Sequence, residues 1–166
     1  AYDAGIPVIM GNGQPIEASV QNTALYFGPN NYEEGKVAGN VANKILGNSG
    51  NVVIVEGATG QDASIKRTEG FVDVLNDGIN VLASQHADWV KDEAVRVMSD
   101  FITSYGEDID LIWSHSDDMG AGVGIALEEA GYEPGEIPSI SLGGSKAGME
   151  SIQAGWITHL IIQSPI

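Results

Sequence analysis

From Gly50 onward, short runs of β-favouring residues alternate with segments of helical periodicity, and this alternation constrains the fold more than any other feature. The β-rich runs are centred near Val53, Leu82, Leu111, Ser141 and His159. Helical patterns separate them over 62–75, 91–102, 119–130 and 147–154. Such alternation is typical of βαβ units, and unbroken apolar runs such as 52–55 indicate parallel strands covered on both faces. The sequence therefore predicts an α/β fold, a three-layer α/β/α sandwich with a mainly parallel, doubly wound sheet.

The first 50 residues do not follow this alternation. The strand-like run 6–10 has no helical segment next to it, and a turn-rich linker separates it from a second β-rich run over 23–27. A helix is expected over 32–46, with Asn31 as its N-cap and Glu34 completing a capping box. An apolar strand without a partner is prone to association. We therefore predict that the run 6–10 is disordered, or that it pairs with a second copy of the chain or with a separate fragment of the protein.

Charge and composition exclude several classes of protein. Acidic residues number 23 against 7 basic ones, a net charge of −16, whereas a nucleic-acid binder needs Lys and Arg against the phosphates. No apolar run approaches the roughly 20 residues of a membrane helix. The absence of cysteine excludes disulfides, thiol catalysis and Cys-ligated metal. The acidic stretch between Arg96 and Lys146 fits a solvated surface or, alternatively, adaptation to a saline habitat.

Polar residues follow the predicted strands at one edge of the sheet. Ligands of open parallel sheets bind at the carboxyl ends of the strands, and these ends carry the segments 56–60, 86–89, 115–118, 143–145 and 163–164. Their short polar side chains can hydrogen-bond hydroxyl groups, and the face of one large aromatic residue can pack on a sugar ring. The pattern predicts a neutral polyhydroxylated solute. The candidate contacts at these strand ends are Trp89, Ser116, Asp117 and Gly143.

Three of these residues also have a structural interpretation. Trp89 opens a helix and can serve packing alone. Ser116 or Asp117 precedes the next helix and suits its N-cap, where the helix dipole favours a carboxylate.

Metal, cofactor and catalytic sites find little support. His115 and Asp117 lack a third metal ligand at helical spacing. The glycines over 57–60 and 143–144 complete no phosphate-loop motif. Ser145 has no evident histidine partner and no nucleophile elbow. The sequence therefore predicts no metal, no cofactor and no enzyme.

Five segments together point to a known family. They are 4–9, 57–71, 85–89, 116–119 and 162–165. In this order they resemble the ribose- and galactose-type members of the type I periplasmic solute-binding proteins, which are the binding components of sugar ABC importers. The resemblance covers nearly the whole chain.

The resemblance implies that residues 31–162 form the C-terminal solute-binding lobe of a two-lobed clamp. Residues 1–30 would hold the last strand of a missing N-terminal lobe and the first hinge crossover, and residues 163–166 the return crossover. Further implications are ligand contacts from Asn12 and Ser164, a sugar or polyol as solute, and an ABC transporter permease as partner. The location would be periplasmic or extracellular, with membrane anchoring through a missing N-terminus as one alternative.

The chain departs from the sugar contacts of that family at four places. Asn12-Gly13 stands where such binders often carry Asp-Arg, and Ile65 where ribose binders carry a ligand-binding arginine. Ser116 replaces an asparagine and Gly143 an aspartate. These departures disfavour a typical pyranose and leave open a furanose, a polyol, a more apolar small molecule or a degenerate site.

Two other functions fit parts of the sequence. The effector-binding domain of a LacI-like transcription regulator shares this architecture, although the chain has no DNA-binding head and is acidic. A small α/β hydrolytic enzyme would use Asp117, Asp118 or Ser145, although no nucleophile, base and orienting group assemble in the pattern.

Overall fold

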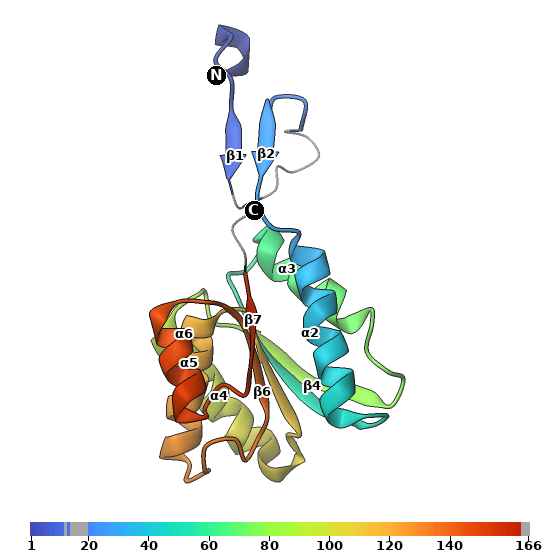
Figure 1. Ribbon diagram of the computed structural model, residues 1–166, viewed down its shortest axis with the longest axis vertical. Coiled ribbons are helices and arrows are strands. Elements are labelled where there is room, and N and C mark those ends of the chain that lie inside the picture. The colour runs from blue at the N-terminus through green and yellow to red at the C-terminus, as the bar shows by residue number, and fades with distance from the viewer. Residues whose placement is uncertain (12, 14–19, 164–166) are drawn as a thin grey trace.

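The main sheet has five parallel strands in the order β4–β3–β5–β6–β7 (Figure 1). The computed structural model describes residues 1–11, 13 and 20–163. The strands are β3 (Gly50–Glu56), β4 (Ile79–His86), β5 (Leu111–Ser114), β6 (Ser139–Gly143) and β7 (His159–Ile162). Each β-rich run of the sequence from Gly50 onward is a strand of this sheet, and its parallel pairing confirms the predicted fold class.

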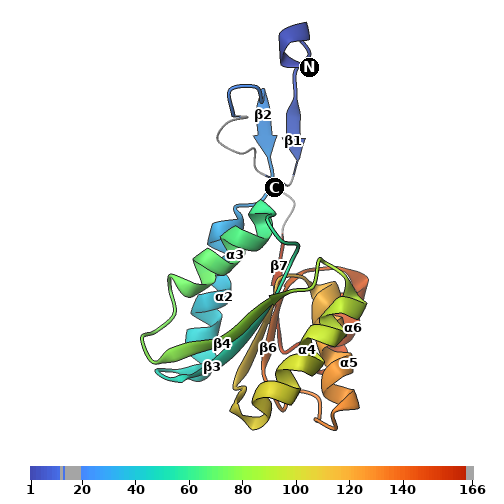
Figure 2. The ribbon, with the colours of Figure 1, turned by 180° about the vertical axis from the view of Figure 1, so that it is seen from behind.

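Helices cover both faces of this sheet, as Figures 1 and 2 show. They are α2 (Asn31–Leu46), α3 (Asp62–Val72), α4 (Lys91–Tyr105), α5 (Asp117–Glu129) and α6 (Lys146–Ala154), with a short 3-10 turn, η2 (Gly106–Asp108), after α4. Val52 and Ile54 pack with α2 and α3, whereas Val53 and Val55 pack with α4 and α5. All four side chains are fully buried, which explains why β3 is an unbroken apolar run.

The strand order places a topological switch between β3 and β5. From β3 the chain passes through α3 to β4 at the edge, and then returns through α4 to β5 on the other side of β3. The segments that follow β3 and β5 therefore diverge to opposite faces of the sheet and open a crevice at its carboxyl edge. The candidate contacts Trp89, Ser116, Asp117 and Gly143 belong to this edge.

Glycines allow α2 and α3 to cross at backbone contact. A Cβ atom at Gly70 would lie 2.0 Å from the carbonyl oxygen of Tyr32, and one at Gly35 would lie 2.2 Å from that of Arg67. Backbone atoms cannot turn aside as the end of a flexible side chain can. A larger residue at either position must therefore separate the two helices.

Replacing Gly70 with alanine should lower the free energy of unfolding by about 1–3 kcal/mol, because the overpacked contact outweighs the better helix propensity of alanine. Ile65→Ala in the same helix is the control, since Ile65 is 43% exposed and its truncation should cost about 0.5 kcal/mol or less. Urea unfolding of the two variants measures the difference. Equal effects would show that the helices do not touch at Gly70.

An N-terminal extension projects from the main domain (Figure 1). After η1 (Tyr2–Ala4), the strands β1 (Ile9–Gly11) and β2 (Leu25–Phe27) pair in parallel as a separate two-stranded sheet. The prediction of disorder is wrong for residues 9–11, because the next β-rich run of the same chain supplies their hydrogen-bonding partner. Pairing with a second copy or with a separate fragment stays a prediction.

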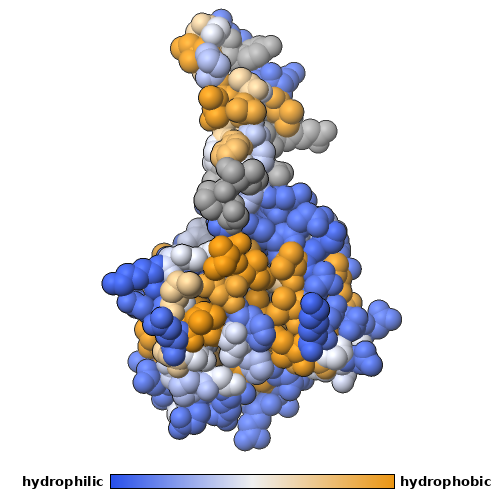
Figure 3. All heavy atoms as spheres, viewed as in Figure 1, coloured by the Kyte–Doolittle hydropathy of each residue, from blue (hydrophilic) through white to orange (hydrophobic). Residues whose placement is uncertain are grey.

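This small sheet still exposes apolar surface. The side chains of Ile9, Leu25 and Phe27 are 66%, 54% and 54% exposed, and Figure 3 shows apolar residues along both strands. Two strands cannot bury a face of their own. Self-association through the N-terminal strand therefore stays a prediction.

The start of α2 differs by one residue from the prediction. Asn30, not Asn31, is the N-cap, and its side chain accepts a hydrogen bond from the N–H of Glu33 at 3.2 Å. Asn31 is buried within the first turn. Glu34 takes no part in a capping box, because its carboxylate turns to Arg67 on α3.

Candidate functional site

A pocket of about 380 Å³ opens at the carboxyl edge of the main sheet. Its lining residues come from the end of β6 and from the segments that follow β3, β4, β5 and β7. They are Gln61, Ala63, Arg67, Trp89, Ser116, Asp117, Leu142, Gly143 and Gln163. The pocket lies at the edge that the strand order predicts for a ligand, and its volume is in the range of small-molecule sites.

Trp89 forms the aromatic wall of the pocket. The backbone φ angles of Asp88 and Trp89 are 51° and 63°, a left-handed conformation that few non-glycine residues adopt. The indole lies against Gly57, where a Cβ atom would be 2.0 Å from Cζ2. Its Nε1–H donates to Oε1 of Gln61 at 2.6 Å, and the guanidinium of Arg67 lies 5.6 Å from the ring centre. These contacts hold the ring so that it offers a fixed apolar surface.

Two polar residues at the start of α5 bond to the backbone. Ser116 is the N-cap, and its Oγ accepts from the N–H of Met119 at 3.3 Å; a hydroxyl that accepts one bond still has a hydrogen to donate. Oδ2 of Asp117 accepts from the N–H groups of Gly144 at 2.8 Å and Ser145 at 2.7 Å. The Asp117 carboxylate thus occupies the position at the start of α6 where an anion would bind.

Gly143 makes room for this carboxylate. With φ of 154°, a Cβ atom at Gly143 would lie 2.4 Å from Cγ of Asp117. Gly148 on α6 is equally close to the carboxylate, with its Cβ position 2.4 Å from Oδ2. An aspartate at position 143, which the resemblance leads one to expect, would therefore collide with Asp117.

Asp117 should stabilise the fold in its ionised form. Burial raises the pKa of Asp117, but hydrogen bonds from Gly144 and Ser145 lower it more, so that it lies below the ordinary value. A depressed pKa in the folded state contributes stability above the unfolded pKa of about 3.9, and this contribution is lost as the pH falls through the folded pKa. Asp117→Asn should lower the free energy of unfolding by about 1–3 kcal/mol at neutral pH. The difference in free energy of unfolding between the unmodified protein and Asp117→Asn should become smaller below about pH 4.

Urea unfolding of both proteins at a series of pH values measures this difference in free energy. Asp118→Asn is the matched control, because Asp118 is the next residue and is exposed. If the difference in free energy of unfolding were as large at about pH 3 as at neutral pH, the role given to the Asp117 carboxylate would be contradicted.

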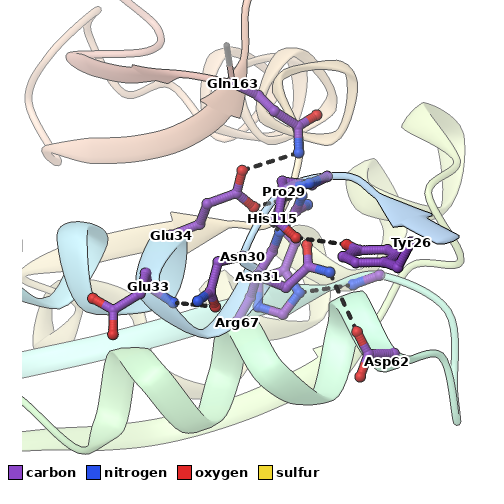
Figure 4. Close-up of polar contacts among 11 residues, drawn as sticks. Tyr26, Pro29, Asn30, Asn31, Glu33, Glu34, Asp62, Arg67, His115 and Gln163 are labelled. Atoms are coloured by element: carbon purple, nitrogen blue, oxygen red, sulfur yellow. Dashed lines mark hydrogen bonds and ion pairs between the residues drawn. The ribbon is translucent and has the colours of Figure 1, made fainter. Parts of the chain in front are cut away.

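Arg67 is the buried cation of the pocket (Figure 4). Its side chain is 7% exposed, and its Nε and Nη2 donate to Oε2 of Glu34 at 3.1 and 3.0 Å. Nη1 donates to the carbonyl oxygen of His115 at 2.7 Å. Burial lowers the pKa of Arg67, and the Glu34 carboxylate opposes that shift. The guanidinium charge is therefore balanced by a protein group before any ligand binds.

His115 has a structural role beside this ion pair. Its Nδ1 accepts from the N–H of Gly57 at 3.2 Å, so that Nε2 carries the hydrogen and faces Oγ1 of Thr68 at 3.3 Å. Burial, together with the charge of Arg67, lowers the pKa of His115 well below its ordinary value. Both ring nitrogens are engaged away from Asp117, and the described residues contain no group of three potential metal ligands.

The structure brings together the predicted contacts that it describes. Trp89, Ser116, Asp117 and Gly143 line one pocket. Asn12 and Ser164 lie outside the described residues. Ile65, which the resemblance placed at the position of a ligand-binding arginine, lines a different surface pocket, whereas Arg67 lines this one.

Sequence reasoning did not select three polar residues that line the pocket. Gln163 follows the last strand, and that position was the signal that could have found it. Arg67 lies in the segment 57–71 that carries the resemblance, but a charged residue in an amphipathic helix does not by itself indicate burial. Gln61 gave no signal, because its role depends on the indole of Trp89.

The comparison with known proteins agrees with this geometry. The sequence matches the family described as "Periplasmic binding protein domain" over residues 1–166. The chain belongs to this family.

Relatives of this periplasmic binding protein domain are named for sugars and polyols. The ribose import binding protein RbsB of Escherichia coli is 30% identical over 166 residues, which cover 99% of this chain and 54% of that protein. The xylitol-binding protein of Mycolicibacterium smegmatis is 38% identical over 112 residues, which cover 66% of this chain and 32% of that protein. A crystal structure from Mycobacterium smegmatis in complex with β-D-fucofuranose matches with a TM-score of 0.91 and 29% identity, covering 98% of this chain and 55% of that one. The chain thus spans about half the length of the relatives that it matches throughout.

Proposed function

We propose that this chain forms one lobe of a two-lobed protein that binds a sugar or polyol and delivers it to an ABC importer. The main support for this proposal is the pocket itself, in which the fixed indole of Trp89 lies beside amide and hydroxyl groups of the protein. The charges of Arg67 and Asp117 are already balanced by protein groups. A neutral polyhydroxylated solute can therefore bind without leaving a charge unpaired.

The names of the relatives support this class of ligand. Two are named for ribose and xylitol, and one structure holds β-D-fucofuranose. These small solutes combine several hydroxyl groups with C–H surface that can pack on Trp89. A phosphorylated sugar is a poorer fit, because Asp117 already takes the N–H groups at the start of α6.

Binding without chemical change is part of the proposal. Two of the three residues on which a hydrolytic mechanism would rely have roles in helix capping and loop structure. Oγ of Ser145 caps α6 by accepting from the N–H of Gly148 at 3.1 Å, and Asp117 holds the preceding loop. These structural roles support a function without catalysis by either residue.

The remaining assignments concern the whole protein. We propose that residues 31–162 are the lobe, that the crossovers lie within 1–30 and 163–166, and that a second lobe closes over the pocket. The proposed partner is a membrane permease, and the proposed location is periplasmic or extracellular, with or without an anchor. Within the described ranges, no helix has both the length and the apolar character to cross a membrane.

Titration calorimetry on a two-lobed form tests the function. D-Ribose, xylitol and D-fucose are the probes, and Trp89→Ala should weaken the binding of the preferred one at least about tenfold. Val90→Ala is the control, because Val90 is adjacent, 47% exposed and outside the pocket lining. Absence of binding to any of the probes, or equal effects of the two variants, would contradict the proposal.

A further inference from the structure

Gln163 joins the buried ion pair at the point where the chain leaves β7. Its Nε2 donates to Oε1 of Glu34 at 3.0 Å, while Arg67 uses only Oε2 of the same carboxylate (Figure 4). The Glu34 side chain is 15% exposed. Each oxygen of one carboxylate therefore has a different partner, and Gln163 lies 129 positions from Glu34 in the sequence.

The chemistry of the carboxylate determines which way the Gln163 amide points. An ionised carboxylate only accepts hydrogen bonds, so that the amide must present its nitrogen to Glu34. The amide oxygen is then directed away from Glu34, as Figure 4 shows. Gln163 also lines the pocket with Trp89 and Ser116. Without a carboxylate on one side, either end of an amide could face a ligand.

Other hydrogen bonds fix the positions of Gln163 and Glu34 relative to each other. The backbone N–H of Gln163 donates to the carbonyl oxygen of Gly143 at 2.8 Å, which extends the β6–β7 pairing to the base of the side chain. Glu34 is held by two donors of Arg67, and Arg67 is held in turn by the carbonyl oxygen of His115. Neither partner therefore has to be ordered by the ligand.

We propose that Glu34 is a positioning residue that makes Gln163 a hydrogen-bond acceptor toward the solute. The pocket would then select, at this point, a ligand group that donates, such as a hydroxyl. This inference rests on the proposed function, because it concerns the same pocket and ligand class. Glu34 itself touches Gln163 and not the solute.

A double-mutant cycle on the two-lobed form tests the coupling. Glu34→Gln should weaken D-ribose or xylitol binding about tenfold when Gln163 is present, because the amide loses its imposed orientation. In a Gln163→Ala background the same substitution should change affinity less than about twofold. Glu33→Gln is the matched control, since Glu33 is the preceding residue, exposed, and paired with Lys36 on the surface. A role confined to the stability of the lobe would instead give the same loss in both backgrounds, and that result would overturn the inference.

Fluorine-substituted sugars report the polarity of the contact. Replacing the ligand hydroxyl that meets Gln163 with fluorine removes a donor, so the unmodified protein should discriminate against that analogue about tenfold. The ratio of affinities for the sugar and its fluorine analogue should become smaller in Glu34→Gln, because the Gln163 amide is then free to turn its N–H toward the fluorine. Unchanged discrimination would contradict an acceptor role imposed by Glu34.

A measurement without ligand separates this inference from the proposed function. In the 166-residue chain, the side-chain N–H resonances of Gln163 are assigned by their loss in Gln163→Ala. They should shift and exchange faster with solvent in Glu34→Gln, but not in Glu33→Gln. If the Gln163 side-chain resonances neither shift nor exchange faster in Glu34→Gln, the inference is overturned even if sugars bind. Failure of all sugar probes would instead refute the proposed function alone.

Discussion

The 166-residue chain by itself should bind its solute about a thousandfold more weakly than a two-lobed form that contains it. Small-molecule sites bury most of their ligand, but every residue that lines this pocket comes from one edge of one sheet. The opposite side of a bound solute would face water. Losing about 4 kcal/mol of contacts from a second lobe corresponds to this change in affinity.

Titration calorimetry on both forms with D-ribose and xylitol measures the difference. Thermal unfolding of the short form serves as the control, since a folded lobe shows that weak binding does not arise from loss of structure. Equal and tight affinity in the two forms would place the whole site within this lobe and contradict the two-lobed proposal.

Arg67→Met should have the largest effect on stability, about 3–5 kcal/mol, because it leaves the mostly buried Glu34 carboxylate without its cation. The side chains of the pair are 7% and 15% exposed, and Arg67 also donates to the carbonyl oxygen of His115. For a chain of this size the midpoint of thermal unfolding should fall by roughly 6–20 °C. Adding Glu34→Gln to Arg67→Met should recover part of the loss, because it removes the unpaired charge.

Lys66→Met provides the matched control. Lys66 is the neighbouring cation on α3, 43% exposed, and its ion pair with Glu69 lies on the surface. Its loss should cost about 1 kcal/mol or less. If the two methionine variants had the same unfolding midpoint, the Arg67–Glu34 pair would not hold the segments together at the pocket.

Much of the fold followed from patterns within single segments. The apolar run 52–55 indicated a strand covered on both faces, and its residues do alternate between the two buried layers. Trp89, Ser116, Asp117 and Gly143 were selected among the residues that follow predicted strands. They share a pocket because the carboxyl ends of parallel strands meet at one edge of a sheet. Periodicity and strand direction were sufficient for these conclusions.

Local patterns failed where a distant partner decided the outcome. Glu34 matched a capping box, but Arg67, 33 residues further along the chain, binds its carboxylate. The run 6–10 was expected to be unpaired within its own chain because no helical segment lies next to it. Its pairing partner, β2, lies further along the chain, and the pattern of apolar residues does not indicate which strands pair. Ile65 was compared with a ligand-binding arginine, although the face of α3 that meets the pocket carries Arg67.

The sequence by itself determined the alternation of strands and helices, the parallel sheet and the edge at which a ligand would bind, because these depend on side-chain periods of two and 3.6 residues. The tertiary structure decided which polar groups face the pocket and which are used up inside the protein. Asp117 bonds to the loop before α6 only because Gly143 and Gly148 leave space for it. A carboxylate, a guanidinium or an amide takes its role from the partner that packing brings within about 3 Å, and no local pattern records which partner that is.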